Sequence, residues 1–323
     1  MTGPMTTTAV RRTETAVAEA APAKPPRRGR RLGWERRRAA VLMVAPAVIL
    51  LTWWIGIPTI ASLVLAFTHY DVLAGTISWA GLGNFRDIFA DPIWNRSIWH
   101  TVVYTFFTVP VAMAIAVAIA VLLNSKLRGR AWYRAAYFLP HITATVAIAL
   151  VWMWMFEPNI GLFNAVLGQV GIQGPAWLSD PAWAMPAVIV VSVWKGIGLK
   201  MLIYLAALQS IPPELYEAAD VDGATPRRKF FAITLPLLRP ATFFVFIVSL
   251  IDSFQVFEQV YVLTPDGGPA NATTVMTLEI YRSAFGKFDM SRACAQSMVL
   301  FVFLLVLTVI SRRLTGKDSD AEL

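Results

Sequence analysis

Residues 98–123 read IWHTVVYTFFTVPVAMAIAVAIAVLL and contain no Asp, Glu, Lys or Arg. A helix needs about 20 mainly apolar residues to cross the hydrocarbon core of a bilayer, which is roughly 30 Å thick. This stretch is therefore long enough to span a membrane. The chain as a whole agrees, because 57% of its 323 residues are hydrophobic and only 15% are charged, far from the composition of soluble proteins. The sequence predicts an integral membrane protein.

Five further apolar stretches have a similar length. Their Leu, Ile, Val, Phe and Ala runs are typical of helices and not of the alternating strands of a membrane barrel. The six predicted spans lie near residues 40–67, 98–123, 135–156, 184–208, 238–263 and 294–312. We therefore expect an all-α bundle of six transmembrane helices, in a membrane domain over residues 39–314.

The net charge of +8 has an uneven distribution along the chain. Lys and Arg gather before the first span, in residues 126–134, in residues 227–239 and after the last span. By the positive-inside rule, both termini and the loops after spans two and four are predicted to be cytoplasmic. The loops near residues 69–97, 157–183 and 264–293 are then predicted to face outward. This pattern indicates membrane orientation, so we expect membrane lipid and not nucleic acid as a partner.

Both ends of the chain are polar. Residues 1–38 are rich in Ala, Pro, Thr and Arg and show no apolar period, which predicts a disordered cytoplasmic tail. Its basic cluster, Arg27–Arg38, fixes the orientation of the first span or, alternatively, binds anionic lipid. A cleaved signal peptide is not expected, because the basic region is too long and the apolar run that follows spans a full bilayer. Residues 315–323 are predicted to form a second, short cytoplasmic tail.

A polar motif separates spans four and five. It reads Glu217-Ala218-Ala219-Asp220-Val221-Asp222-Gly223, and Ile233-Thr234-Leu235-Pro236 follows nine residues later. Ser210 with Pro212 and Pro213 is predicted to open a short helix, which Gly223 closes in the left-handed conformation before Thr225 and Pro226 open the next. An amphipathic helix on the bilayer surface is the alternative, but it does not explain the glycine or the Leu-Pro spacing.

This motif resembles the cytoplasmic coupling motif of permease subunits in binding-protein-dependent ABC importers. The shared pattern is Glu-Ala-Ala, three residues, Gly, nine residues, Ile, one residue and Leu-Pro. The resemblance implies that a coupling segment, at about residues 211–236, docks into a groove on a separate ATP-hydrolysing subunit. It assigns ATPase coupling to Glu217, Ala218, Ala219, Asp222, Gly223, Leu235 and Pro236. Glu217 is the candidate for a charged contact with that subunit, because a carboxylate suits an Arg partner.

Shorter runs extend the resemblance over roughly residues 40–312. They include Gly81-Leu82-Gly83-Asn84-Phe85, Asp91-Pro92, Pro158 to Asn164, Trp177 to Pro181 and Gly267-Gly268-Pro269. Together they are similar to the first-permease type of the maltose-like carbohydrate importers, and glycerol-3-phosphate permeases share much of the pattern. The family implies a type I ABC importer permease fold in the bacterial cytoplasmic membrane. It also implies three kinds of partner: a second permease subunit, two copies of an ATP-binding subunit and an extracytoplasmic solute-binding protein.

Motifs of enzymes are missing from the sequence. His69, His100 and His141 are scattered, and no partner lies at metal-ligand spacing. The chain also has no G-x-x-x-x-G-K-[ST] phosphate-binding loop. We therefore expect no catalytic residue, metal or cofactor, and we expect ATP to be bound by another polypeptide. Cys294 is the only cysteine, which excludes an internal disulfide.

Polar residues in spans four and five are candidates for a solute pathway, because such residues are costly in a membrane. At 100° per residue, Ser249, Asp252, Gln255 and Gln259 share one stripe of a helix, with Phe254 and Phe257 beside it. Glu258, about 120° from Asp252, is expected to face elsewhere. The candidate pathway residues are Trp194, Lys195, Asp252, Gln255 and Gln259. Alternatively, the stripe only holds neighbouring helices together.

The two lysines of span four allow more than one role. Lys195 pairs with Asp252 or meets an anionic solute, and Lys200 either snorkels or forms a structural ion pair. The expected solute is a carbohydrate, with glycerol-3-phosphate or a polyol as the alternative. An ion-coupled secondary transporter is a remoter alternative, because six spans show no convincing internal repeat. A membrane glycosyltransferase is remoter still, since Asp266 alone does not supply an acidic catalytic pair.

Overall fold

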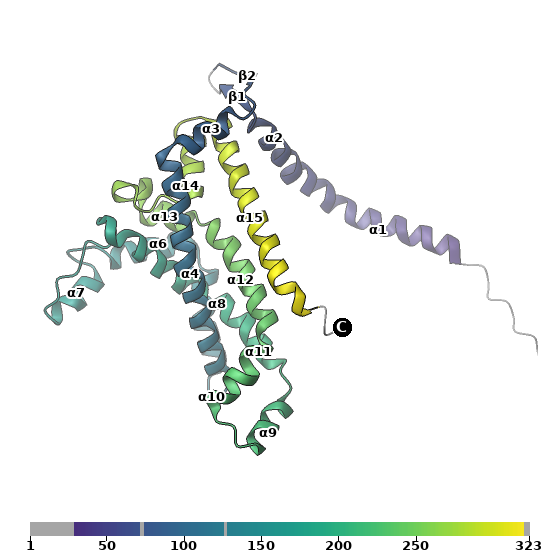
Figure 1. Cartoon of the computed structure of the whole chain (residues 1–323), viewed down its shortest axis with the longest axis vertical. Helices are drawn as coiled ribbons and strands as arrows, with labels where there is room; N and C mark the ends of the chain where they lie inside the picture. Colours follow the sequence, from purple (N-terminus) through teal and green to yellow (C-terminus); the bar gives the residue numbers. More distant parts are fainter. Residues whose placement is uncertain (1–28, 72–73, 126–127, 320–323) are drawn as a thin grey trace, which may run out of the picture. The chain divides into compact units, whose positions relative to one another are not determined.

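The computed structural model describes residues 29–71, 74–125 and 128–319 (Figure 1). These residues form two units, one ending at Pro58 and a larger one beginning at Thr59. The first unit holds α1, Gly29–Leu51, and the π-helix η1, Thr52–Gly56. The next helix, α2, covers Ile57–Leu65. All other elements belong to the second unit.

The predicted tails are only partly described. Residues 1–28 and 320–323 lie outside the described residues. Residues 29–38, expected to be disordered, belong to α1, where the Cζ of Arg38 lies 3.7 Å from the ring centroid of Trp34. These two side chains are one helical turn apart, so a cation–π contact stabilises the helix there. Residues 315–319 likewise continue α15, Met290–Ser319.

The described residues contain four candidate spans, or up to six if each bent helix pair is counted as one span. Four helical stretches are long and apolar enough to cross a membrane without a break: Arg37–Leu65, Pro92–Asn124, Pro181–Gln209 and Met290–Ser311. Two more consist of bent helix pairs, with an angle of 97° between Arg130–Ile142 and Thr145–Met155 and of 64° between Pro226–Leu237 and Arg239–Phe254. The expected helical membrane fold is confirmed.

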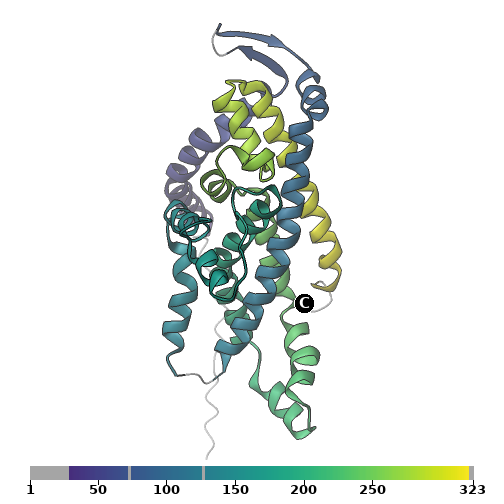
Figure 2. The ribbon, with the colours of Figure 1, turned by 90° about the vertical axis from the view of Figure 1, so that its left-hand side faces the viewer.

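The core of the second unit is the pair of α4, Pro92–Asn124, and α8, Pro181–Gln209. Three alanines, spaced four residues apart on one face of α4, are fully buried against Met201 and Tyr204 of α8. Small residues let two membrane helices approach closely. The helix α5, Arg130–Ile142, packs on α8. The helix α12, Arg239–Phe254, packs on α4 and on α15 (Figures 1 and 2).

Two predicted spans are broken. In the third, α5 ends at Ile142 and α6, Thr145–Met155, begins after extended backbone at Thr143 and Ala144. In the fifth, α12 ends at Phe254 and α13, Glu258–Leu263, begins three residues later. The continuous helix predicted over residues 238–263 is therefore wrong. The Oγ1 of Thr277 donates to the carbonyl of Val256 in this gap, which satisfies a backbone group that the helix leaves free.

A two-stranded hairpin, absent from the sequence predictions, follows α2. Strands β1, Thr68–Asp71, and β2, Thr76–Trp79, pair antiparallel, with Thr68 opposite Trp79. The side chain of Asn84, in α3, Gly83–Ala90, donates to the carbonyls of Ala66 and Thr68 at 2.9 and 2.8 Å. These bonds hold the hairpin against the start of α3 and give a structural role to the asparagine of the Gly-Leu-Gly-Asn-Phe run.

Further short helices lie in the segments between the spans. They are α7, Leu162–Gln169, η3, Pro265–Gly267, η4, Pro269–Asn271, α14, Met276–Tyr281, and η5, Arg282–Gly286. Asp266, Ala270 and Asn271 all have positive φ angles, which are uncommon for residues with a side chain. Arg282 donates to the carbonyl of Asp266 and, at 3.1 Å, to the Oδ1 of Asn271. One guanidinium thus holds this tight turn together.

Candidate functional site

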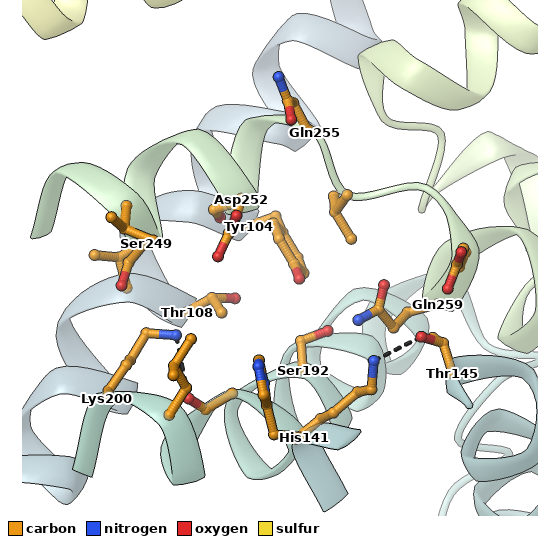
Figure 3. A pocket seen from close by; sticks show the side chains of 18 of the residues that line it. Tyr104, Thr108, His141, Thr145, Ser192, Lys200, Ser249, Asp252, Gln255 and Gln259 are labelled. Atoms are coloured by element: carbon orange, nitrogen blue, oxygen red, sulfur yellow. Dashed lines mark hydrogen bonds between the residues drawn. The ribbon is translucent and has the colours of Figure 1, made fainter. Parts of the chain in front are cut away.

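A polar cavity of about 420 Å³ lies in the second unit (Figure 3). Its walls come from α4, α5, α6, α8, α12, α13 and the break after α12. The polar residues that line it are Tyr104, Thr108, His141, Thr145, Ser192, Lys195, Lys200, Ser249, Asp252, Ser253, Gln255, Glu258 and Gln259. Because these helices are otherwise apolar, the cavity gathers their polar side chains at one place.

Basic groups line one wall of the cavity. Lys195 and Lys200 come from α8 and His141 comes from α5. The Nζ of Lys195 donates to Thr145 Oγ1 at 2.6 Å, and the Nζ of Lys200 donates to the carbonyl of Gly196 at 3.2 Å. Neither lysine forms an ion pair within the described part of the chain. The pairing of Lys195 with Asp252 that the sequence allowed is therefore not present.

Acidic and amide groups line the opposite wall. Asp252 is exposed in the last turn of α12, and Gln255 lies in the break that follows. Glu258 and Gln259 open α13 and also line the cavity. The expectation that Glu258 faces elsewhere is wrong, because the break at 255–257 interrupts the helical wheel on which it rested. Figure 3 shows Asp252 facing the side from which Lys200 and His141 enter.

Hydroxyl groups line the cavity between these two walls. Tyr104, Ser192, Ser249 and Ser253 are buried there. The Oγ of Ser253 donates to Thr105 Oγ1 at 3.0 Å, which joins α12 to α4. Clustered hydroxyls and amides both donate and accept hydrogen bonds, so this cavity can bind a solute with many hydroxyl groups.

Four of the five predicted pathway residues line the cavity: Lys195, Asp252, Gln255 and Gln259. Trp194 does not. Its ring lies 5.4 Å from that of Trp152, beside an apolar groove formed with Leu139 and Pro140. Adjacent residues on a helix point about 100° apart, so Trp194 and Lys195 face different sides of α8.

Sequence reasoning missed Tyr104, Thr108, His141 and Ser192 as lining residues. Single hydroxyls in membrane helices commonly bond to their own backbone, as Ser192 does to the carbonyl of Val188 at 2.8 Å. A single hydroxyl in the sequence of a span therefore does not indicate that the residue lines a cavity. His141 lies near the bend at Thr143 and Ala144, which the sequence did not reveal.

The coupling segment forms a compact pair of helices. The first, α9, covers Pro213–Val221 and is followed by its C-cap Asp222 and by Gly223, whose φ is +69°. The amide of Gly223 donates to Asp220 and that of Ala224 to Ala219, the Schellman arrangement of a glycine-terminated helix. The predicted left-handed role of Gly223 is confirmed.

The second half of the coupling segment begins at Thr225. Its hydroxyl accepts from the amide of Arg228 at 3.3 Å and so caps α10, Pro226–Lys229, as predicted. The π-helix η2, Phe230–Thr234, and α11, Leu235–Leu237, continue toward α12. Ser210 has a different role from the one predicted, because its hydroxyl donates to Ala207 at the end of α8 and not to α9.

Two side-chain contacts tie the halves of the coupling segment together. The hydroxyls of Tyr216 and Thr234 lie 2.9 Å apart, and the Nζ of Lys229 lies 2.5 Å from Asp220 Oδ1. The outer surface is left free, since Glu217, Ala218 and Asp222 are exposed and Val221 is 89% exposed.

Comparison with known proteins places this architecture in a family. Residues 93–316 match the family described as the binding-protein-dependent transport system inner membrane component. The permease protein AraP of the arabinooligosaccharide transport system of Bacillus subtilis is 32% identical over 289 residues, which cover 89% of this chain and 91% of that one. The chain therefore belongs to this family of ABC transporter permeases.

Two further similarities support the same family. The permease protein UgpA of the sn-glycerol-3-phosphate transport system of Shigella flexneri is 35% identical and covers 84% of this chain and 92% of its own length. A bacterial alginate ABC transporter, solved in complex with an alginate pentasaccharide-bound periplasmic protein, contains a chain that matches with a TM-score of 0.78 and 25% identity. That match covers 88% of this chain and 96% of the other.

Proposed function

We propose that this chain is the transmembrane subunit of an ATP-driven importer, and that it translocates a carbohydrate delivered by an extracytoplasmic binding protein. The observation that carries the proposal is the cavity between α4, α8 and α12, which offers hydroxyl, amide and charged groups. Recognition of a sugar requires many hydrogen-bonding groups placed around one volume. The arabinooligosaccharide and alginate transporters named above support a saccharide as the solute.

Glycerol-3-phosphate or a polyol is the second candidate solute. The similarity to UgpA supports it. Either solute would be carried by the same kind of importer, in which the binding protein delivers the solute from outside and the permease lets it pass.

ATP hydrolysis is assigned to two copies of a separate subunit. Glu217, Ala218, Ala219, Asp222 and Gly223 would contact that subunit, with Leu235 and Pro236 supporting them from the second half of the coupling segment. The exposed valine and carboxylates of the coupling segment support this docking role. We further propose that both termini lie in the cytoplasm of a bacterium, and the Lys and Arg residues that gather before the first span and after the last one support this side.

A second permease subunit would complete the cavity. Asp252, Gln255 and Glu258 are exposed although they lie in or next to a span. Charged groups within a membrane face a protein interior or a water-filled space and not lipid. A partner subunit that covers this side of α12 and α13 would meet that requirement.

Uptake in a deletion strain tests the proposal. Cells lacking the gene should lose ATP-dependent uptake of a labelled saccharide, and uptake should not respond to collapse of the ion gradients. Purification of the tagged chain in mild detergent should also retain an ATP-hydrolysing subunit. Uptake that follows an ion gradient, together with no copurifying ATPase, would replace this proposal by that of a secondary transporter.

A further inference from the structure

The two lysines of the cavity have unused hydrogen-bonding capacity. Lys195 donates to a threonine hydroxyl and Lys200 to a backbone carbonyl, whereas each ammonium group carries three donors. No carboxylate oxygen lies within 4.0 Å of either ammonium group among the described residues. Both side chains are partly buried, and neither positive charge has the direct ion pair that buried charges normally have.

The charges in the cavity are separated between its walls. Lys195, Lys200 and His141 stand on α8 and α5, while Asp252 and Glu258 stand at the end of α12 and the start of α13. Figure 3 shows Lys200 and His141 on the side opposite Asp252. An oxyanion placed in this space is attracted to the basic wall and repelled by the acidic one, so the cavity fixes which way round an acidic solute lies.

We propose that the cavity takes a saccharide that carries an oxyanion group, with this group bound by Lys195 and Lys200. Its neutral hydroxyls face Asp252, Gln255 and Gln259, which accept and donate hydrogen bonds. The inference rests on the proposed function, because it names the class of carbohydrate that the importer carries. Lysine suits such a group as a mobile point charge, and charge-assisted bonds are stronger than neutral ones.

The solute class can be tested with a mixture of saccharides. Wild-type and deletion cells are grown on a hydrolysate that contains neutral oligosaccharides together with uronate-bearing ones, and the saccharides left in the medium are measured. Uronate-bearing saccharides left behind by the deletion strain alone would support the inference. Neutral saccharides alone left behind would overturn it but leave the proposed function intact. No difference between the strains would count against the proposed function, and the inference would fall with it.

The assignment to the two lysines is tested with matched variants. Lys195→Met and Lys200→Met should each lower uptake of the acidic saccharide about tenfold to a hundredfold, the loss expected for one charge-assisted hydrogen bond. Lys200→Arg should retain most of the uptake because it keeps the charge. Uptake is normalised to the amount of each variant in the membrane, so that a loss of protein is not read as a loss of binding.

A double variant distinguishes solute binding by Lys200 from an ion pair with Asp252 that forms in another conformation of the protein. If Lys200 instead pairs with Asp252 in another state, Lys200→Met combined with Asp252→Asn should recover the uptake that the single variants lose. The inference predicts no recovery, because the oxyanion still lacks its partner. Recovery would remove Lys200 from solute binding, and unchanged uptake in both Met variants would remove both lysines.

Discussion

Asp252 occupies the last turn of α12, where the helix ends and the cavity begins. We predict that Asp252→Ala and Gln255→Ala each lower uptake about tenfold, because a hydrogen bond to a charged or buried polar partner is lost. Asp252→Asn tests whether the charge or only the hydrogen bond matters. Initial uptake rates, normalised to the amount of protein in the membrane, provide the measurement. Normal uptake in both alanine variants would exclude these residues from the pathway.

Gly223 is the residue on which the turn of the coupling segment depends. A Cβ added there meets no atom within 4 Å, but the φ of +69° is one that residues with a side chain rarely adopt, Asn and Asp more often than the others. We predict that Gly223→Asp leaves the protein in the membrane but abolishes ATP-dependent uptake, since a left-handed conformation costs about 1–2 kcal/mol for a residue with a side chain.

A matched control is available for Gly223. Gly286 also has open space around it but lacks a positive φ. Gly286→Asp should therefore retain far more uptake than Gly223→Asp. Equal activity of the two variants, measured at equal amounts in the membrane, would contradict a special role for the turn.

At the scale of elements, the contact of α8 with α5 depends on a single glycine. A Cβ on Gly198 would lie 2.8 Å from the Cα of Phe138, so the α5 backbone would have to move. We predict that Gly198→Ala destabilises the protein by about 1–3 kcal/mol, as overpacking does. At Gly196 the nearest atom is the flexible tip of Lys200, 3.0 Å away. Gly196→Ala should therefore be close to neutral in thermal unfolding in detergent. Equal losses in the two variants would argue against the close contact.

The sequence predicted elements well where a local pattern determines them. The length of the apolar runs predicted the spans. Gly223, with Thr225 and Pro226, predicted the turn of the coupling segment. Asp180 illustrates a signal that was present but not used: its side chain accepts from the amide of Ala182 at 2.9 Å and so begins α8. An acidic residue followed by proline is a readable helix start.

Breaks within apolar spans could not be predicted in this way. The end of α12 at Phe254 is stabilised by Thr277, which lies far along the chain and donates to Val256. The two halves of the third span have different main neighbours, because α5 packs on α8 and α6 packs on α13. Since both breaks lie within stretches long enough to be read as single spans, the lining of the cavity was predictable only in part, and Trp194 and Glu258 were misplaced.

At the scale of the whole molecule, orientation remains a prediction that labelling can test. Cys294 is the only cysteine, so Cys294→Ser gives a background for single-cysteine variants. Val221 is 89% exposed in the coupling segment, and Ile160 is 70% exposed after α6. In intact cells stripped of any outer membrane, an impermeant maleimide should label Ile160→Cys and not Val221→Cys. In inside-out vesicles the result should reverse. Labelling of both from the same side would refute the predicted topology.

The helix α12 has a mechanical consequence. It starts directly after the coupling segment, and its final turn carries Asp252. Its 16 residues make a rod about 24 Å long, so a tilt of about 10° at its base would displace the tip by about 4 Å. A stroke of that size exceeds the length of a hydrogen bond. A push at the base would therefore be enough to take Asp252 out of reach of a bound solute. The same helix would then both transmit the movement and hold or release the solute.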